Sequence, residues 1–236
     1  MIKPITTLFM LQSLDGKIST GDVDELDVDK DLPKMPGVKE GLHQYYDLEK
    51  LTDPFSLNTG RVMAKIGVNT RTTEPTKMGC SFIIIDNRPH LTLAGTEYLA
   101  KWVKRLFLVT SNPNHPAHEL QKKYTNIEII SFKNEVDLAE LLRRLREEYQ
   151  IEKLTIQSGG TLNAAWLRAS LIDYVSVVVA PCLIGGTNTQ SLIGGESLHT
   201  QADLQKIRAL MLEKCTVLEN SYVHLRYKVV NGQNEN

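Results

Sequence analysis

The chain has 236 residues, of which 42% are hydrophobic and 23% charged, and its formal net charge at pH 7 is −1. These values are typical of a globular protein of moderate size and argue against a nucleic-acid-binding surface, which would be strongly basic. No apolar run approaches the roughly 20 residues of a membrane-spanning helix, and the N-terminus lacks the features of a signal peptide. We therefore expect a cytoplasmic protein without a membrane partner.

The cysteines limit the chemistry further. Cys80, Cys182 and Cys215 are widely separated, and neither a CxxC pair nor a histidine pattern accompanies them. We expect buried free thiols in a reducing compartment, and we expect no metal site.

The first apolar run, residues 5–11, predicts a buried strand. A turn follows in which Ser13, Asp15 and Lys17 occupy alternate positions. In an extended segment alternate residues share a face, so a hydroxyl, a carboxylate and an ammonium could together hold a polar ligand. A solvated turn with a surface ion pair would have the same spacing. The residues alone are compatible with both.

Residues 21–36 are acidic and predict a flexible loop, and residues 41–51 predict a short helix. A second strand at 55–57 leads to Thr59 and Gly60. These residue types suit a capped helix start, and they also suit a turn whose backbone amides meet a phosphate.

Two arginines follow this turn. Arg61 and Arg71 are cations available to a substrate phosphate. Each alone would equally suit an exposed surface.

The middle of the chain alternates predicted strands with predicted helices. Helices are expected at 97–104 and after Asn134, which would be an N-cap before leucines at helical spacing. Such alternation is typical of an open α/β sheet with ligands at the carboxyl ends of its strands. Three apolar runs are the expected strands: 81–85, 106–110 and 127–132.

A strand, a glycine turn, a helix and a second strand then follow one another. The strands are expected at 154–156 and 175–180, and the helix between them at 161–171. The buried face of this helix is expected to carry four side chains: Leu162, Ala165, Trp166 and Ala169.

The glycine pair before this helix, Gly159 and Gly160, is the main candidate binding feature. Without a Cβ the backbone can approach a ligand closely, and the first amides of a helix have no internal partner. The helix dipole favours an anion there, so a phosphate or pyrophosphate would fit. A tight strand-to-helix turn would need the same glycines, and the sequence has neither a GxGxxG nor a P-loop pattern at this point.

The end of the chain changes character. Residues 210–218 and 222–230 predict a hairpin, and residues 231–236 a disordered polar tail. We expect a single domain over residues 1–230.

Four segments in combination resemble the reductase domain of riboflavin biosynthesis. They are SLDGKIS near the start, NTGRVM near residue 60, GGTLNAAWLRASLIDYVSVVVAP with a later GG, and the terminal hairpin. The resemblance implies a dihydrofolate-reductase-like α/β fold, with a mostly parallel central sheet, helices on both faces and a C-terminal antiparallel hairpin. It also implies a homodimer that uses NADPH to reduce the ribosylamino group of a pyrimidine 5′-phosphate to a ribitylamino group.

The resemblance also assigns cofactor contacts by position. Thr59 and Gly60 would lie along the nicotinamide, and Ser111 would lie near the adenosine. Ser158 is also expected to be a cofactor contact. The residues that would hold the pyrophosphate itself are Gly159, Gly160, Thr161 and Leu162.

The substrate contacts implied by the resemblance are Ser13, Asp15, Lys17, Arg61 and Arg71. Hydride transfer needs no protein nucleophile, so the protein supplies placement, charge stabilisation and a proton. Lys17 would donate or steer that proton, and Asp15 would orient Lys17 or the substrate.

Two departures from the family pattern affect the substrate. Ser158 stands where members commonly have a glutamate, and a neutral hydroxyl cannot do the same acid–base work. Residues 65–77 also differ from the usual substrate loop. A same-fold reductase of a pterin or another small heterocycle is therefore an alternative, as is a dinucleotide-binding protein without catalysis. The zinc deaminase motif of bifunctional relatives, HxE followed by PCxxC, does not occur in this sequence.

Overall fold

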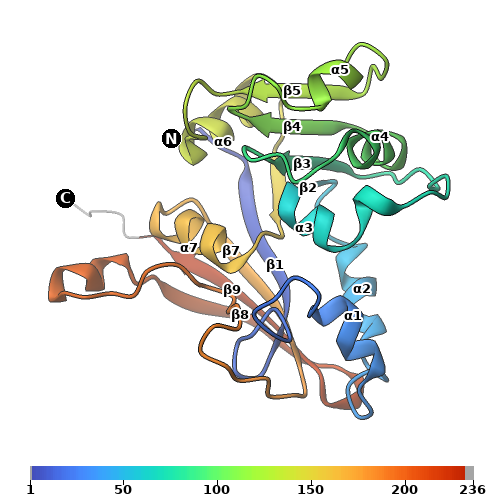
Figure 1. Ribbon diagram of the computed structural model, residues 1–236. Coiled ribbons are helices and arrows are strands. Elements are labelled where there is room, and N and C mark those ends of the chain that lie inside the picture. Colours follow the sequence, from blue (N-terminus) through green and yellow to red (C-terminus); the bar gives the residue numbers. More distant parts are fainter. Residues whose placement is uncertain (1, 232–236) are drawn as a thin grey trace. The chain divides into compact units, whose positions relative to one another are not determined.

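The structure is a computed structural model that describes residues 2–231. The chain forms two compact units. Unit 1 comprises Asp53–Ser158 with the residues that precede Ile5, and unit 2 comprises Ile5–Thr52 and the chain from Gly159 onward. Figure 1 labels the elements of both. The domain expected over residues 1–230 includes both units, and the tail expected at 231–236 lies outside the described residues except for Asn231.

Unit 1 is built on parallel strands. Apolar runs rich in β-branched residues form them, and each strand pairs in parallel with its neighbours in the order β5-β4-β3-β2-β6. Their carboxyl ends therefore meet at one edge, and the strands predicted in these regions are confirmed. The bounds are β2 (Phe55–Thr59), β3 (Ser81–Ile85), β4 (Leu106–Thr110), β5 (Ile127–Ser131) and β6 (Lys153–Ile156).

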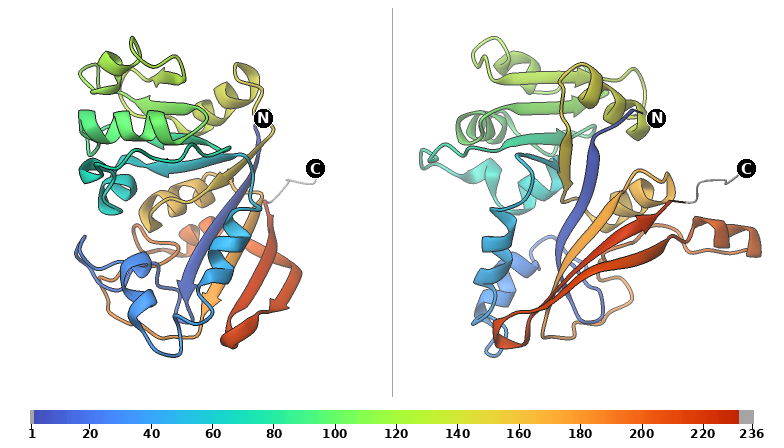
Figure 2. Two further views of the ribbon diagram at one scale, coloured as in Figure 1. Left: turned by 90° about the vertical axis from the view of Figure 1, so that its right-hand side faces the viewer. Right: turned by 180° about the vertical axis from the view of Figure 1, so that it is seen from behind.

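Helices cover both faces of this sheet, as the left panel of Figure 2 shows. On one face, Phe82 and Leu108 pack with Leu99 of α4 and other apolar residues. On the other face, the Phe107 ring lies edge-on to Tyr149, which follows α6. The bounds are α3 (Gly60–Lys65), η2 (Val68–Thr70), α4 (Leu93–Trp102), α5 (Ala117–Leu120) and α6 (Leu138–Glu147).

Two helices of unit 1 begin at residues other than those expected, because of their caps. The helix expected from residue 97 begins at Leu93, since the Thr92 hydroxyl accepts a hydrogen bond from the first turn. The cap of α6 is Asp137 and not Asn134, since the Asp137 carboxylate accepts two first-turn amide hydrogen bonds.

Unit 2 combines a parallel pair of strands with an antiparallel hairpin. β1 (Ile5–Ser13) lies parallel to β7 (Tyr174–Ala180), and β9 (Val223–Val230) joins β7 in the antiparallel sense. β8 (Ala209–Val217) pairs with β9 and completes the order β1-β7-β9-β8. The hairpin turn contains η4 (Glu219–Ser221). The expected C-terminal hairpin is confirmed.

Helices lie on both sides of β1 in unit 2. The right panel of Figure 2 shows α2 on one side and α7 on the other. Phe9 of β1 stacks on Tyr45 of α2, with ring centroids 5.2 Å apart. The α/β class with helices on both faces is therefore confirmed: the strands of unit 1 are parallel, and unit 2 adds the parallel pair of β1 and β7 to the antiparallel C-terminal strands. The remaining bounds are α1 (Val28–Asp31), η1 (Leu32–Lys34), α2 (His43–Glu49), α7 (Gly160–Arg168) and η3 (Gln201–Lys206).

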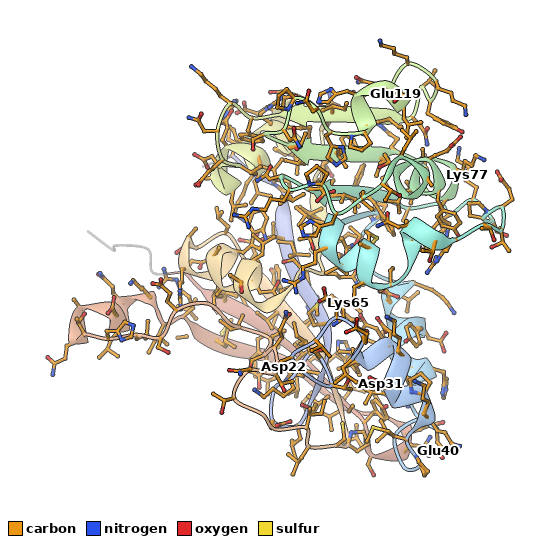
Figure 3. The ribbon with its side chains drawn as sticks, viewed as in Figure 1. Asp22, Asp31, Glu40, Lys65, Lys77 and Glu119 are labelled. Carbon is orange, nitrogen blue, oxygen red and sulfur yellow. The ribbon has the colours of Figure 1, made fainter. Side chains whose placement is uncertain are left out.

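The acidic segment 21–36 is not the flexible loop that we expected. It contains α1 and η1, whose Val28 and Leu32 are buried in the core of unit 2. The carboxylates serve local structure: Asp27 caps α1, and Asp31, labelled in Figure 3, ends it. Capping and apolar contacts therefore give a helical structure to part of a segment whose acidic composition had predicted a loop.

Two further expectations for unit 2 were wrong. Ala165 and Ala169 of α7 are exposed, and Asn163 is buried instead because its side-chain amide donates to the Leu192 carbonyl. Cys215 is free but exposed, because β8 is the last strand of its sheet. Cys80 and Cys182 are half-buried, and neither takes part in a disulfide.

One buried carboxylate fixes the loops that follow β3 and β4 at the edge of unit 1. Asp86 accepts hydrogen bonds from the backbone amides of His90 (3.1 Å) and Leu91 (3.0 Å). Its oxygens also lie 3.0 Å from Nδ1 of His90 and 3.1 Å from Nε2 of His115. Because the Ala117 amide donates to Nδ1 of His115, we assign the ring hydrogen that Asp86 accepts to Nε2.

These contacts set the charge of Asp86. Burial alone would raise the pKa of its carboxyl, but the hydrogen bonds from His115, Leu91 and His90 together hold the pKa below its ordinary value of 3.8. Because the pKa of Asp86 is lower in the folded state, its carboxylate stabilises the folded protein at pH values above the ordinary pKa. That stabilisation is lost as the pH falls through the folded-state value.

We expect Asp86→Ala to lower the free energy of unfolding at pH 7 by about 2–3 kcal/mol, because buried donors lose their acceptor. Urea denaturation measures this change, and the difference from wild type should shrink below about pH 4. Asp47→Ala removes an exposed carboxylate on α2 and should leave the unfolding curve unchanged. Equal curves for wild type and Asp86→Ala at pH 7 would contradict the role given to this carboxylate.

Candidate functional site

Hydrogen bonds from the side chains of the turn after β1 stabilise that turn. Ser13 Oγ donates to Asp15 Oδ1 at 2.5 Å and accepts from the Lys17 amide at 2.9 Å. Gly16 has φ +78°, a left-handed conformation that glycine adopts without strain. The three polar residues predicted to act together are thus brought together in unit 2.

Asp15 and Lys17 both contact the segment after β7, residues 182–195, which we call the 182–195 loop. The two Asp15 carboxylate oxygens accept from the amides of Ile184 (3.1 Å) and Gly185 (2.6 Å). The Lys17 ammonium donates to three acceptors in the loop: the Gly186 carbonyl (2.9 Å), the Thr189 carbonyl (3.0 Å) and Ser191 Oγ (3.2 Å).

The charge on Asp15 follows from these contacts. The hydrogen bond from Ser13, with those from the Gly185 and Ile184 amides, outweighs desolvation and lowers the pKa of Asp15 to about 2. The carboxylate is therefore ionised throughout the range in which enzymes are usually assayed. The sequence spacing was compatible with a solvated turn or with a group that binds a polar ligand, and in the structure the Asp15 and Lys17 side chains bond to a loop far along the chain.

The other side of the 182–195 loop contacts the start of α7. The Gly194 amide donates to the Gly160 carbonyl at 2.9 Å, and Asn163 Nδ2 donates to the Leu192 carbonyl at 2.9 Å. Gly160 is buried, and a Cβ there would lie 2.2 Å from the Ser191 carbonyl oxygen. The close backbone approach that the glycine pair permits is made, at Gly160, by the protein's own loop.

Gly159 differs from its neighbour. It is half-buried, and a Cβ there would meet only Gln190 Oε1, at 3.6 Å. Within residues 2–231, no side chain caps the first turn of α7. Thr161 is exposed and Leu162 half-buried in that turn. Its amides therefore fit the donor set that a phosphate requires.

In unit 1 the predicted residues lie at the carboxyl edge of the sheet. Thr59 caps α3, its Oγ1 accepting from the Val62 amide at 3.2 Å. Gly60 is buried against Asp86, since a Cβ there would lie 2.2 Å from the Asp86 carboxyl carbon. Ser111 follows β4, the neighbour of β3, and its amide donates to Asn87 at 2.9 Å. Ser158, at the end of the unit, is buried.

The two predicted arginines have different surroundings. Arg61 is exposed in the first turn of α3. The Arg71 guanidinium carbon lies 5.4 Å from the ring centroid of Tyr98 and 5.2 Å from that of Trp102, so this side chain packs on α4. Lys65, labelled in Figure 3, is the last residue of α3.

Sequence reasoning missed two features of this arrangement. One is Asp86 with His90 and His115, because His115 lies 29 residues from its partner in the chain. The other is the 182–195 loop. Its paired glycines were visible as GG, but the sequence did not show what they contact.

Strands with glycine turns at their carboxyl ends define an α/β protein with candidate ligand positions at those ends. A family model described as the RibD C-terminal domain matches residues 4–222. The chain belongs to this family.

Curated relatives agree with this assignment. A protein of Methanothermobacter thermautotrophicus named 2,5-diamino-6-ribosylamino-4(3H)-pyrimidinone 5′-phosphate reductase is 27% identical over 209 residues, covering 86% of this chain and 89% of the relative. A protein of the same name from Archaeoglobus fulgidus is 23% identical over 221 residues, covering 89% of this chain and 94% of the relative.

Solved structures share the fold. RibD of Acinetobacter baumannii matches with a TM-score of 0.68 at 19% identity, over 96% of this chain but only 58% of that one. A pyrimidine reductase-like protein from Corynebacterium diphtheriae matches with a TM-score of 0.66 at 15% identity, over 97% of this chain and 93% of that one. Among residues 2–231, no helix combines the length and apolar character that crossing a bilayer requires.

The two glycines of the pair give a matched test of this geometry. Gly160→Ala should lower the free energy of unfolding by about 1–2 kcal/mol, because its methyl group must displace the Ser191 carbonyl. Gly159→Ala places its methyl group in ordinary contact and should be tolerated. Thermal and urea denaturation compare them. Equal stability of the two variants would show that the loop does not lie against Gly160.

Proposed function

We propose that this protein is an NADPH-dependent oxidoreductase that reduces the ribosylamino group of a pyrimidine 5′-phosphate to a ribitylamino group. The observation that carries the proposal is the family match over residues 4–222. Two relatives that match over most of their length bear the name of such a reductase, which supports the same substrate class here.

The uncapped start of α7 supports the choice of a dinucleotide. In unit 2 the amides of Gly160, Thr161 and Leu162 would hold the pyrophosphate beside Gly159. In unit 1 Thr59 and Gly60 would contact the nicotinamide, and Ser111 would contact the adenosine. These assignments follow the family resemblance, and the same is true of Ser158 as a cofactor contact.

NADPH supplies a hydride when bound, and the protein's part is placement, charge and a proton. Ser13, Arg61 and Arg71 are the substrate contacts of this proposal, whereas Asp15 and Lys17, which the family resemblance also implies, bond to the 182–195 loop. Of the two arginines, Arg61 is exposed and Arg71 is stacked on rings of α4. We assign the proton to solvent, because the three hydrogens of the Lys17 ammonium are donated to the 182–195 loop.

A second candidate substrate follows from Ser158. A serine cannot take the acid–base role of the glutamate that is usual there, so a reductase of a pterin or another small heterocycle is the alternative. A dinucleotide-binding protein without catalysis is the alternative from another class.

The test measures whether the purified protein oxidises NADPH, with loss of NADPH absorbance as the readout. Three substrates are compared: 5-amino-6-(5-phosphoribosylamino)uracil, its 2,5-diaminopyrimidinone counterpart, and dihydrofolate. We expect turnover with a ribosylamino-pyrimidine phosphate and none with dihydrofolate. Turnover with dihydrofolate alone would support the alternative substrate. Binding of NADPH with no turnover would support the non-catalytic protein.

A homodimer in the cytoplasm completes the proposal. The edge strand β8 exposes Leu210, Met211 and Leu212 by 45–53%, an apolar surface that a second copy would cover. Three cysteines without a disulfide suit a reducing compartment. Light scattering should give twice the chain mass, and Met211→Lys should shift the protein toward monomer. A wild-type monomer would contradict the dimer.

A further inference from the structure

The turn after β1 and the start of α7 are joined by one loop within unit 2. We propose that Asp15 and Lys17 are positioning residues that hold the 182–195 loop against the first turn of α7, and that they act on cofactor binding through this loop rather than on proton transfer. The proposal rests on the proposed function, because it concerns the phosphate position assigned to that turn.

Asp15 holds the near end of the loop. Its two carboxylate oxygens accept from the consecutive amides of Ile184 and Gly185. Gly185 and Gly186 have φ +74° and +83°, left-handed values that are costly for residues with a Cβ. Two successive amides aimed at one carboxylate form an anion-binding turn whose anion is the protein's own. This gives the 185–186 glycine pair a role.

Lys17 holds the middle of the loop. An ammonium group has three hydrogens, and the three acceptors of Lys17 come from Gly186, Thr189 and Ser191. To deliver a proton to a substrate, this side chain would first have to release a loop acceptor. The geometry is therefore that of a cation that gathers loop carbonyls.

Residues 191–194 of the loop connect the contacts of Lys17 to the first turn of α7. Ser191 accepts from Lys17 through its hydroxyl, and its carbonyl lies against Gly160. The Leu192 amide donates to the Gly16 carbonyl at 2.9 Å, and the Leu192 carbonyl accepts from Asn163. A shift of residues 191–194 therefore moves the groups that pack against the first turn of α7.

The test compares Lys17→Met with Lys50→Met, which removes an exposed lysine of unit 2 that pairs with Asp47 at the surface. Lys17→Met should weaken NADPH affinity about tenfold, the size of one charged hydrogen bond, while kcat at saturating NADPH changes less than about threefold. Asp15→Asn should act in the same direction. Lys50→Met should match wild type in both constants.

A second readout does not depend on NADPH. Hydrogen exchange of the Ile184, Gly185, Leu192 and Gly194 amides, measured without ligand, should be faster in Lys17→Met and unchanged in Lys50→Met. A large fall in kcat with unchanged NADPH affinity and unchanged exchange would overturn the proposal and make Lys17 a proton donor. If the wild-type protein neither binds nor oxidises NADPH, the proposed function fails, and the exchange rates alone still support or overturn the holding of the loop.

Discussion

The contact between the Ser191 carbonyl and Gly160 is the constraint on which unit 2 depends. A Cβ at residue 160 would lie 2.2 Å from that oxygen, so the loop can reach α7 only because glycine stands there. The loop stays there because Asp15 and Lys17 bond to its backbone on the other side. The first turn of α7 is left with backbone amides that no side chain within residues 2–231 caps. The backbone of the first turn of α7 would thus bind the ligand, and the same backbone packs against the loop.

Unit 1 solves a similar problem with a buried charge. Three neighbouring strands, β2, β3 and β4, end at one edge, where α3 follows β2 and loop segments follow β3 and β4. Asp86 joins these segments by accepting hydrogen bonds from the loop after β3 and from His115 after β4, and it packs against Gly60 after β2. Burying a carboxylate costs desolvation free energy, and the hydrogen bonds that Asp86 accepts offset this cost. The same hydrogen bonds fix several backbone groups at once. Both units therefore use a carboxylate to fix loop backbone: Asp86 also lies against Gly60, and the loop that Asp15 contacts lies against Gly160.

Local patterns in the sequence predicted most of the fold. Apolar runs identified the parallel strands, and the glycine pair before α7 was recognised as a place of close backbone approach. Features that depend on distant partners were not predicted. The spacing of Asp15 and Lys17 could not show that their partners are 169–174 residues away, and Asn163 was missed because an amide bonded to a loop carbonyl resembles an exposed polar residue in sequence. The acidic composition of 21–36 likewise concealed the caps and buried side chains of α1.

The central claim is that the first-turn amides of α7 bind the diphosphate of NADPH. Hydrogen exchange at Gly160, Thr161 and Leu162, compared in the presence and absence of saturating NADPH, tests this most directly. The account predicts strong slowing of exchange at these amides, with little change at a distant helix of unit 1 such as α6. Exchange that is the same with and without bound NADPH would contradict it.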